Sequence, residues 1–183
     1  MNNKGTTLLE TVLYIGIVMI VLPTFVMFLI NLWQTYTLLD ARSRIEQTAS
    51  VVFLELQNSL TEADAISIST STLANDSGVL KFLDATGQLV TIDRPTVAVT
   101  LVGAPQNVRR LRMQKGTNPA TYLTDPEIDV TQWRIEAIRT DATLSGLRIS
   151  YDMAMLNPGI GAYRHSAFSA DTTFALSGHT IEN

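Results

Sequence analysis

The chain has 183 residues and a formal net charge of −4, and 46% of its residues are hydrophobic. This length suits one modest domain plus an additional segment. Because the sequence contains no cysteine, a disulfide framework, a thiolate zinc site and a cysteine nucleophile are excluded. The mild acidity argues weakly against a general nucleic-acid-binding protein.

Residues 11–39 form an uncharged and strongly apolar run. It is 29 residues long, and as a helix it would reach roughly 43 Å, more than the ~30 Å hydrocarbon core of a bilayer. Trp33 and Tyr36 follow its most apolar part, where membrane proteins place interfacial aromatic residues. A secretory signal peptide has a shorter apolar region, of about 7–15 residues, and a small-residue cleavage site. The run therefore predicts a membrane-spanning helix, which Pro23 would tend to bend.

A short polar and basic stub precedes this run, and it reads Met1-Asn2-Asn3-Lys4-Gly5, followed by Thr6-Thr7-Leu8-Leu9-Glu10. Taken alone, Glu10 would be interpreted as a carboxylate lying among lipid headgroups, because burying a lone charge at membrane depth is costly. Together with Lys4 and Gly5 it resembles the prepilin motif of type IV pilins and type II secretion pseudopilins. In that family a basic leader ends in glycine, and a glutamate lies fifth in the mature chain. Lys4 also predicts a cytoplasmic N-terminus.

The resemblance implies a role for each of these positions. Prepilin peptidase would cleave after Gly5, Thr6 would become the methylated N-terminus, and Glu10 would be the assembly glutamate. Thr6 departs from the family pattern, in which the mature chain usually begins with phenylalanine. Cleavage would create a positively charged α-amino group, which in a bundle of helices can face Glu10 of a neighbouring subunit. Each charge then offsets the desolvation of the other, and the pair sets the register.

Beyond the membrane segment the apolar residues thin to a helical spacing, at Leu38, Ile45, Ala49, Val52, Leu56 and Leu60. This spacing predicts an amphipathic helix, and no glycine or proline interrupts the chain between Asn31 and Thr61. We therefore expect one helix from Thr6 to Glu62, roughly 85 Å long if straight. Its outer half should pack on a sheet.

The rest of the chain alternates in short segments separated by turn residues. Asp84-Ala85-Thr86-Gly87 lies between two such segments and predicts a hairpin. Strands in succession without intervening helices predict an antiparallel sheet and an α+β fold, in which the long helix packs on the sheet. The order of hairpins is also similar to that of minor pilins. The strand candidates are residues 66–70, 79–83, 88–92, 97–102, 108–113, 133–139, 147–153 and 167–176.

Arg109, Arg110 and Arg112 form the one basic cluster, with Lys115 nearby. In a strand, Arg110 and Arg112 would share one face, and Arg109 would point the other way. One hypothesis is a surface that contacts DNA, since related filaments include DNA-uptake machines. The other is a solvated edge strand whose charges discourage aggregation or pair with acidic neighbours. Because no aromatic residues interleave for base stacking, the second hypothesis is favoured.

The sequence shows no constellation typical of an enzyme. His165 and His179 have no Glu or His at metal-ligand spacing. There is no nucleophile elbow and no phosphate-binding loop, and Gly159-Ile160-Gly161 is interpreted as a turn. We therefore expect no catalytic residue, no metal and no cofactor.

These patterns predict a pilin-like structural subunit of a pilus or pseudopilus. It would be a minor subunit, because its Thr6 start and lack of cysteine staples are atypical of an abundant pilin. Its expected parts are a leader (1–5), a transmembrane or assembly half of the helix (6–36), an amphipathic half (37–62) and an extracytoplasmic β-rich domain (63–183).

The expected partners are other pilin subunits, prepilin peptidase and the inner-membrane assembly machinery. The arginine cluster is the one feature that suggests DNA as a further partner. The protein would lie in the cytoplasmic membrane before assembly and then in an extracellular or periplasmic filament. Motility, adhesion, DNA uptake and secretion all remain open as roles. The alternative is a single-pass anchored extracytoplasmic binding domain that never enters a filament.

Overall fold

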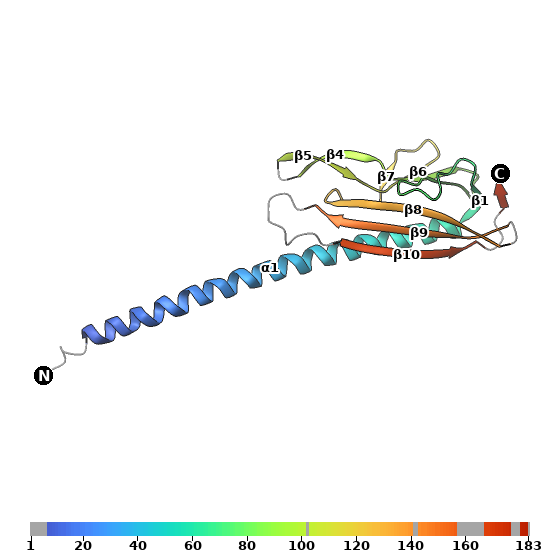
Figure 1. Cartoon of the computed structure of the whole chain (residues 1–183). Coiled ribbons are helices and arrows are strands. Elements are labelled where there is room, and N and C mark those ends of the chain that lie inside the picture. The colour runs from blue at the N-terminus through green and yellow to red at the C-terminus, as the bar shows by residue number, and fades with distance from the viewer. Residues whose placement is uncertain (1–6, 102, 141–142, 157–166, 177–179, 183) are drawn as a thin grey trace. The chain divides into compact units, whose positions relative to one another are not determined.

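The computed structural model describes residues 7–101, 103–140, 143–156, 167–176 and 180–182 (Figure 1). The chain divides into two compact units, Met1–Asp40 and Ala41–Asn183. Within the described residues, one helix, α1 (Thr7–Thr61), precedes eleven strands. The expected long N-terminal helix and the α+β class are therefore confirmed.

The strands form three sheets. The largest has the order β11-β1-β2-β3-β6-β7 and comprises β11 (Thr180–Glu182), β1 (Ala63–Ser67), β2 (Leu80–Asp84), β3 (Leu89–Asp93), β6 (Arg112–Lys115) and β7 (Thr121–Tyr122). The second has the order β10-β9-β8 and comprises β10 (Ala167–Ala175), β9 (Thr143–Met155) and β8 (Ile128–Thr140). The third is a two-stranded ribbon of β4 (Thr96–Leu101) and β5 (Ala104–Arg109). These neighbours pair antiparallel, as expected, except β1 and β11, which pair parallel.

The hairpin expected around Gly87 joins β2 and β3. Gly87 adopts a φ of 76°, a left-handed conformation that glycine accepts without steric cost. Asp84 Oδ1 accepts hydrogen bonds from the amides of Thr86 and Gln88, each at 2.9 Å. These bonds lower the pKa of Asp84, as does the hydrogen bond from the Thr86 hydroxyl, which has the largest effect.

The strand expected over residues 108–113 is interrupted, and this corrects the prediction. β5 ends at Arg109 and β6 begins at Arg112. Between them, the amide of Arg110 donates to Pro95 O at 3.0 Å, and the amide of Leu111 donates to Thr124 Oγ1 at 3.2 Å. Leu111 is completely buried, so the chain leaves the ribbon here and joins the large sheet.

The part of α1 in the first unit exposes its apolar side chains throughout, and Leu9, Ile20 and Trp33 are each more than two-thirds exposed. By length and composition α1 is long and apolar enough to cross a membrane. The helix continues through Pro23, and one turn earlier Ile20 O accepts a hydrogen bond from Thr24 Oγ1 at 2.8 Å. A candidate membrane-spanning helix is compatible with anchoring of the chain to a membrane.

The part of α1 in the second unit packs one stripe into the core. The buried stripe consists of Ala41, Ile45, Thr48, Ala49, Val52, Leu56, Ser59 and Leu60. It includes every residue of the predicted stripe except Leu38, which lies in the first unit and is 47% exposed. The helical spacing therefore predicted the packed face correctly over residues 45–60.

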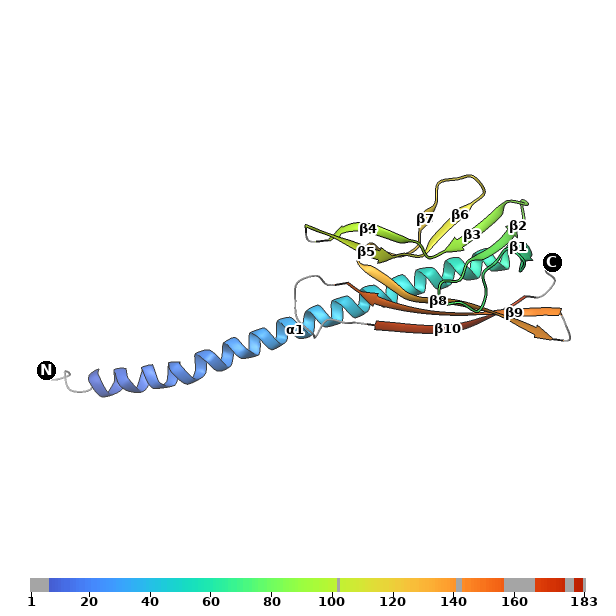
Figure 2. The ribbon, with the colours of Figure 1, turned by 45° about the horizontal axis from the view of Figure 1, so that its top comes forward.

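Three contacts show that α1 packs on both larger sheets (Figure 2). Tyr151 Oη on β9 donates to Ala49 O at 3.3 Å, and the rings of Phe53 and Phe174 stack with centroids 5.8 Å apart. On the large sheet, Ser59 Oγ lies 3.9 Å from Met113 Sδ. The helix thus packs on both sheets, and Trp133 is completely buried in the same core.

The segment 74–78 covers part of the outer edge of β8. The amides of Ala74 and Gly78 donate to Ile135 O at 2.7 Å and to Trp133 O at 3.0 Å. In return, the amide of Trp133 donates to Asp76 O at 2.9 Å. Because this segment leads into β2, it ties the large sheet to the three-stranded sheet.

Candidate functional site

Glu10 is the one expected N-terminal site residue that the structure describes. It lies in the first turn of α1, and its side chain is exposed. An acidic side chain is favourable there because the helix dipole places partial positive charge at the N-terminus. Its neighbours Leu8 and Leu9 are 81% and 79% exposed. Gly5 and Thr6, the expected processing residues, lie outside the described residues.

The position of Glu10 limits the surroundings that it can accept. A carboxylate at the end of a membrane-spanning helix can stay hydrated in the headgroup region at little cost. If it is moved into lipid or into a helix bundle, it requires a cation or several hydrogen-bond donors. Glu10 is therefore stable either at the depth of the lipid headgroups or beside a positively charged group.

Two side chains of the arginine cluster form ion pairs. Arg109 Nε donates to Asp129 Oδ1 at 3.0 Å, and its backbone amide donates to the same oxygen at 2.8 Å. Arg112 Nε donates to Asp93 Oδ1 at 2.9 Å. A second, parallel hydrogen bond from Nη2 completes each pair. Both guanidinium groups are therefore bound to carboxylates of the same chain.

Arg110 has a different environment. Its Nε donates to Thr124 O at 3.0 Å, and its guanidinium carbon lies 4.1 Å above the centre of the Tyr122 ring. This is a cation–π geometry. Tyr122 is twelve residues away in the sequence, so local spacing carried no signal for this contact. The contacts of all three arginines agree better with interactions inside the chain than with a surface that binds the phosphates of DNA.

Asp129 is the most buried carboxylate of this region, with a side chain 10% exposed. Burial raises its pKa, but the hydrogen bonds and positive charge of Arg109 outweigh that effect, so the pKa lies below its usual value. Arg94 adds to this field and donates through Nη1 to Val130 O and Thr131 O, each at 2.7 Å. Neither Asp129 nor Arg94 belongs to a local sequence pattern, because the partners of each lie at least 20 residues away in the chain.

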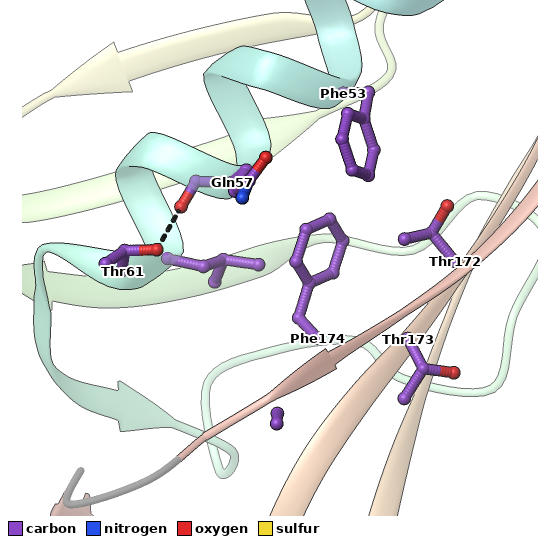
Figure 3. Close-up of a pocket in the computed structure, with 8 residues that line it drawn as sticks. Phe53, Gln57, Thr61, Thr172, Thr173 and Phe174 are labelled. Atoms are coloured by element: carbon purple, nitrogen blue, oxygen red, sulfur yellow. Dashed lines mark hydrogen bonds between the residues drawn. The ribbon is translucent and has the colours of Figure 1, made fainter.

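A hollow opens between α1 and β10 (Figure 3). Its volume is about 270 Å³. The facing rings of Phe53 and Phe174 form its apolar wall, and Thr61 Oγ1 donates to Gln57 O at 2.7 Å at its other side. Its lining is Phe53, Gln57, Leu60, Thr61, Thr172, Thr173, Phe174 and Ala175.

A second hollow of about 450 Å³ continues along the same side of α1. Leu54 and Phe168 contribute to its mainly apolar lining, and Phe53 and Thr172 line both hollows. Its one charged lining residue is Glu46, which pairs with Arg42 at 2.8 Å. The first hollow therefore has a mixed polar and apolar lining and the second a mainly apolar one, and neither brings together an acid, a base and a nucleophile.

The remaining expectations about chemistry concern metals and histidines. Among the residues that the structure describes, no group of three or more His, Asp or Glu side chains is placed to hold a metal ion. His165, His179 and residues 159–161 lie outside the described residues.

Comparisons of the chain with protein-family models, curated proteins and solved structures find no match.

Proposed function

We propose that this chain is a pilin-like structural subunit, which is processed at Gly5 and assembles into a filament through its N-terminal helix. The observation that carries the proposal is that the two halves of α1 differ in burial. One half exposes apolar side chains with Glu10 in its first turn, while residues 41–61 are built into the core of a β-rich unit. A single helix thus joins an anchoring or assembling segment to a folded domain.

The short N-terminal motif supports the same proposal. Lys4, Gly5 and Glu10 have the order and spacing of the prepilin motif. A plain membrane anchor accounts for the apolar helix and tolerates a hydrated carboxylate at its start, but it gives no reason for the spacing of Gly5 and Glu10. In a bundle of such helices, Glu10 would face the new α-amino group of a neighbouring subunit, and the pair would fix the stagger between subunits. The subunit would leave the cytoplasmic membrane only on assembly.

The rival proposal is an anchored extracytoplasmic binding domain that is never incorporated into a filament. The mainly apolar hollow beside β10 is the feature that favours it, because ligand sites are commonly concave and apolar. Against it, the one charged residue that lines this hollow, Glu46, is already paired with Arg42. The two proposals differ in whether the leader is removed.

Intact-mass spectrometry of the protein isolated from its native host tests the processing step. We expect a mass lower by that of Met1–Gly5, with or without one methyl group on Thr6. Gly5→Leu is the matched variant, since a bulky side chain at the cleavage position should leave the full mass. A wild-type chain that retains its leader would overturn the proposal and favour the rival, an anchored binding domain.

A further inference from the structure

β10 has one free edge. Within the described part of the chain, β10 pairs only with β9, along all nine of its residues. No strand of the described residues lies beside the other row of backbone amides and carbonyls, and the two hollows against α1 open next to it. An unpaired row of this kind is a template for a further strand.

The outer edge of β8, at the opposite side of the same sheet, is covered. Segment 74–78 hydrogen-bonds to it at Trp133 and Ile135. Farther along, Arg94 Nη1 caps the carbonyls of Val130 and Thr131. Among the described residues, the chain therefore covers part of one edge of this sheet and places no strand along the other.

β10 also lacks the usual features that protect an edge strand. Lysine, proline and bulges commonly discourage pairing with other chains, and none occurs in Ala167–Ala175. Its one charged residue is Asp171, and this carboxylate already accepts hydrogen bonds from Arg148 Nε on β9, at 2.9 Å to Oδ1. The edge is therefore nearly neutral in charge.

β4 is a second strand of this kind. It pairs only with β5 among the described residues, and it consists of Thr96, Val97, Ala98, Val99, Thr100 and Leu101. The strand carries no charge and no proline, and its threonines and valines favour extended structure. One chain thus presents two unprotected edges, one of nine residues and one of six.

Coverage of the free edges decides how two copies of the chain can pair. If β10 paired with β10 of another copy, the β4 edges of both copies would stay open. If β4 paired with β4, both β10 edges would stay open. Pairing of β4 with β10 covers both kinds of edge, and it is the arrangement that repeats from copy to copy in a filament.

We propose that β4 of one copy of this chain adds as a further strand to the free edge of β10 in the next copy. This inference rests on the proposed function. Such a contact is head-to-tail, because each copy offers β4 to one neighbour and β10 to the other, and repetition gives an open row of subunits. The hollows beside β10 provide space for the side chains of the added strand on the α1 side.

This contact works only together with other contacts between subunits. A stable interface buries at least about 1,000 Å², and pairing along the six residues of β4 is too small to reach that area. Assembly through α1 would hold the two edges at high local concentration, so that a weak pairing becomes occupied. The pairing therefore forms in the assembled protein and not between dilute chains.

The absence of native cysteine permits a direct crosslinking test in the native host. The full-length double variant Ala98→Cys/Thr173→Cys is treated, in sheared filaments and in membranes, with a short bis-maleimide. Both residues are exposed, and neighbouring strands lie about 4.8 Å apart. Thr96→Cys and Thr100→Cys replace Ala98→Cys in parallel, so that a shift in register is covered. Thr117→Cys, at an exposed turn between β6 and β7, replaces Thr173→Cys as the matched control.

We expect a ladder of covalent dimers, trimers and longer species from a double variant, and monomer from each single variant and from the control pair. A dimer from Thr173→Cys alone, or from Ala98→Cys alone, would overturn the proposal in favour of symmetric pairing. A crosslink to a protein of another mass would overturn it in favour of a different partner. If the chain is present in filaments but no position gives a ladder, the pairing is wrong while the proposed function stands. If the chain is absent from filaments and gives no ladder, both are wrong.

Discussion

At the scale of single residues, the buried carboxylate of Asp129 is stabilised by an ion pair with Arg109. Its carboxylate accepts hydrogen bonds from the side chain and from the backbone amide of Arg109. Each charge lowers the cost of burying the other, whereas removal of one partner leaves the other unpaired. The pair connects the end of β5 to β8.

Asp129→Asn should lower the free energy of unfolding by about 1.5–3 kcal/mol at pH 7, because hydrogen bonds to a charged partner are lost. The folded state holds the pKa of Asp129 below its usual value. Its contribution is therefore full above the unfolded pKa of about 3.9 and is lost as the pH falls through the folded pKa. Denaturant unfolding of wild type and variant between pH 7 and pH 3 measures how this difference in the free energy of unfolding changes with pH.

Asp171→Asn is the matched control, since Asp171 pairs with Arg148 on an exposed face of β10 and β9. Solvent screens that pair, so its loss should cost less than the loss of the Asp129 pair. An equal cost for both variants, or a difference between wild type and Asp129→Asn that persists unchanged at pH 3, would contradict the role given to Asp129.

Gly146 on β9 leaves no space for a side chain. A Cβ atom added there would lie 2.8 Å from the carbonyl oxygen of Phe174 on β10. Because backbone cannot rotate away, Gly146→Ala should lower the free energy of unfolding by about 1–3 kcal/mol, as overpacking does. Gly16→Ala is the control, since a Cβ there meets no atom within 4 Å. Equal midpoints of denaturation for Gly146→Ala and wild type would show that the strands are not this close.

At the scale of elements, α1 has two different halves. The helical spacing of apolar residues predicted which face of residues 45–60 is buried. It could not predict the partners of that face, since Tyr151, Phe174 and Met113 come from three different strands. A periodic pattern reports which side of a helix is buried and carries no information about what covers it.

Leu54 and Leu56 offer a matched pair of substitutions on this helix. Leu56 is completely buried and Leu54 is 54% exposed. Leu56→Ala should lower the free energy of unfolding by about 2–5 kcal/mol, because it leaves a cavity, whereas Leu54→Ala should stay within about 0.5 kcal/mol. Denaturant unfolding of the detergent-solubilised chain, followed by near-ultraviolet circular dichroism, compares the two. A larger loss for Leu54→Ala would place the packed face of α1 on its other side.

At the scale of the whole molecule, the proposed function depends on charge at the start of α1. Glu10→Ala and Glu10→Gln should both abolish incorporation into filaments and leave membrane insertion unchanged, because neither variant can pair with an amino terminus. Glu10→Asp keeps the charge and should retain part of the incorporation. Immunoblots of sheared filaments and of membrane fractions measure both quantities. Wild-type amounts of Glu10→Gln in filaments would show that Glu10 has no role in assembly.

Composition and local spacing were enough to predict the features that depend on neighbouring residues. The apolar run, the amphipathic stripe and the turn at Gly87 follow from composition and spacing over a few residues, and each is present as expected. The candidate site at Glu10 came from the sequence alone, since its significance lies in its distance from Gly5.

Features that depend on pairing between distant segments could not be predicted in this way. Local alternation predicted one strand through residues 108–113, but burial of Leu111 and its hydrogen bond to Thr124 divide that strand in two. The ion pairs of Arg109 and Arg112, and the open edge of β10, likewise depend on which strands become neighbours. Strand partners are selected by the burial of side chains and backbone groups across the whole unit, and no local period of the sequence records that selection.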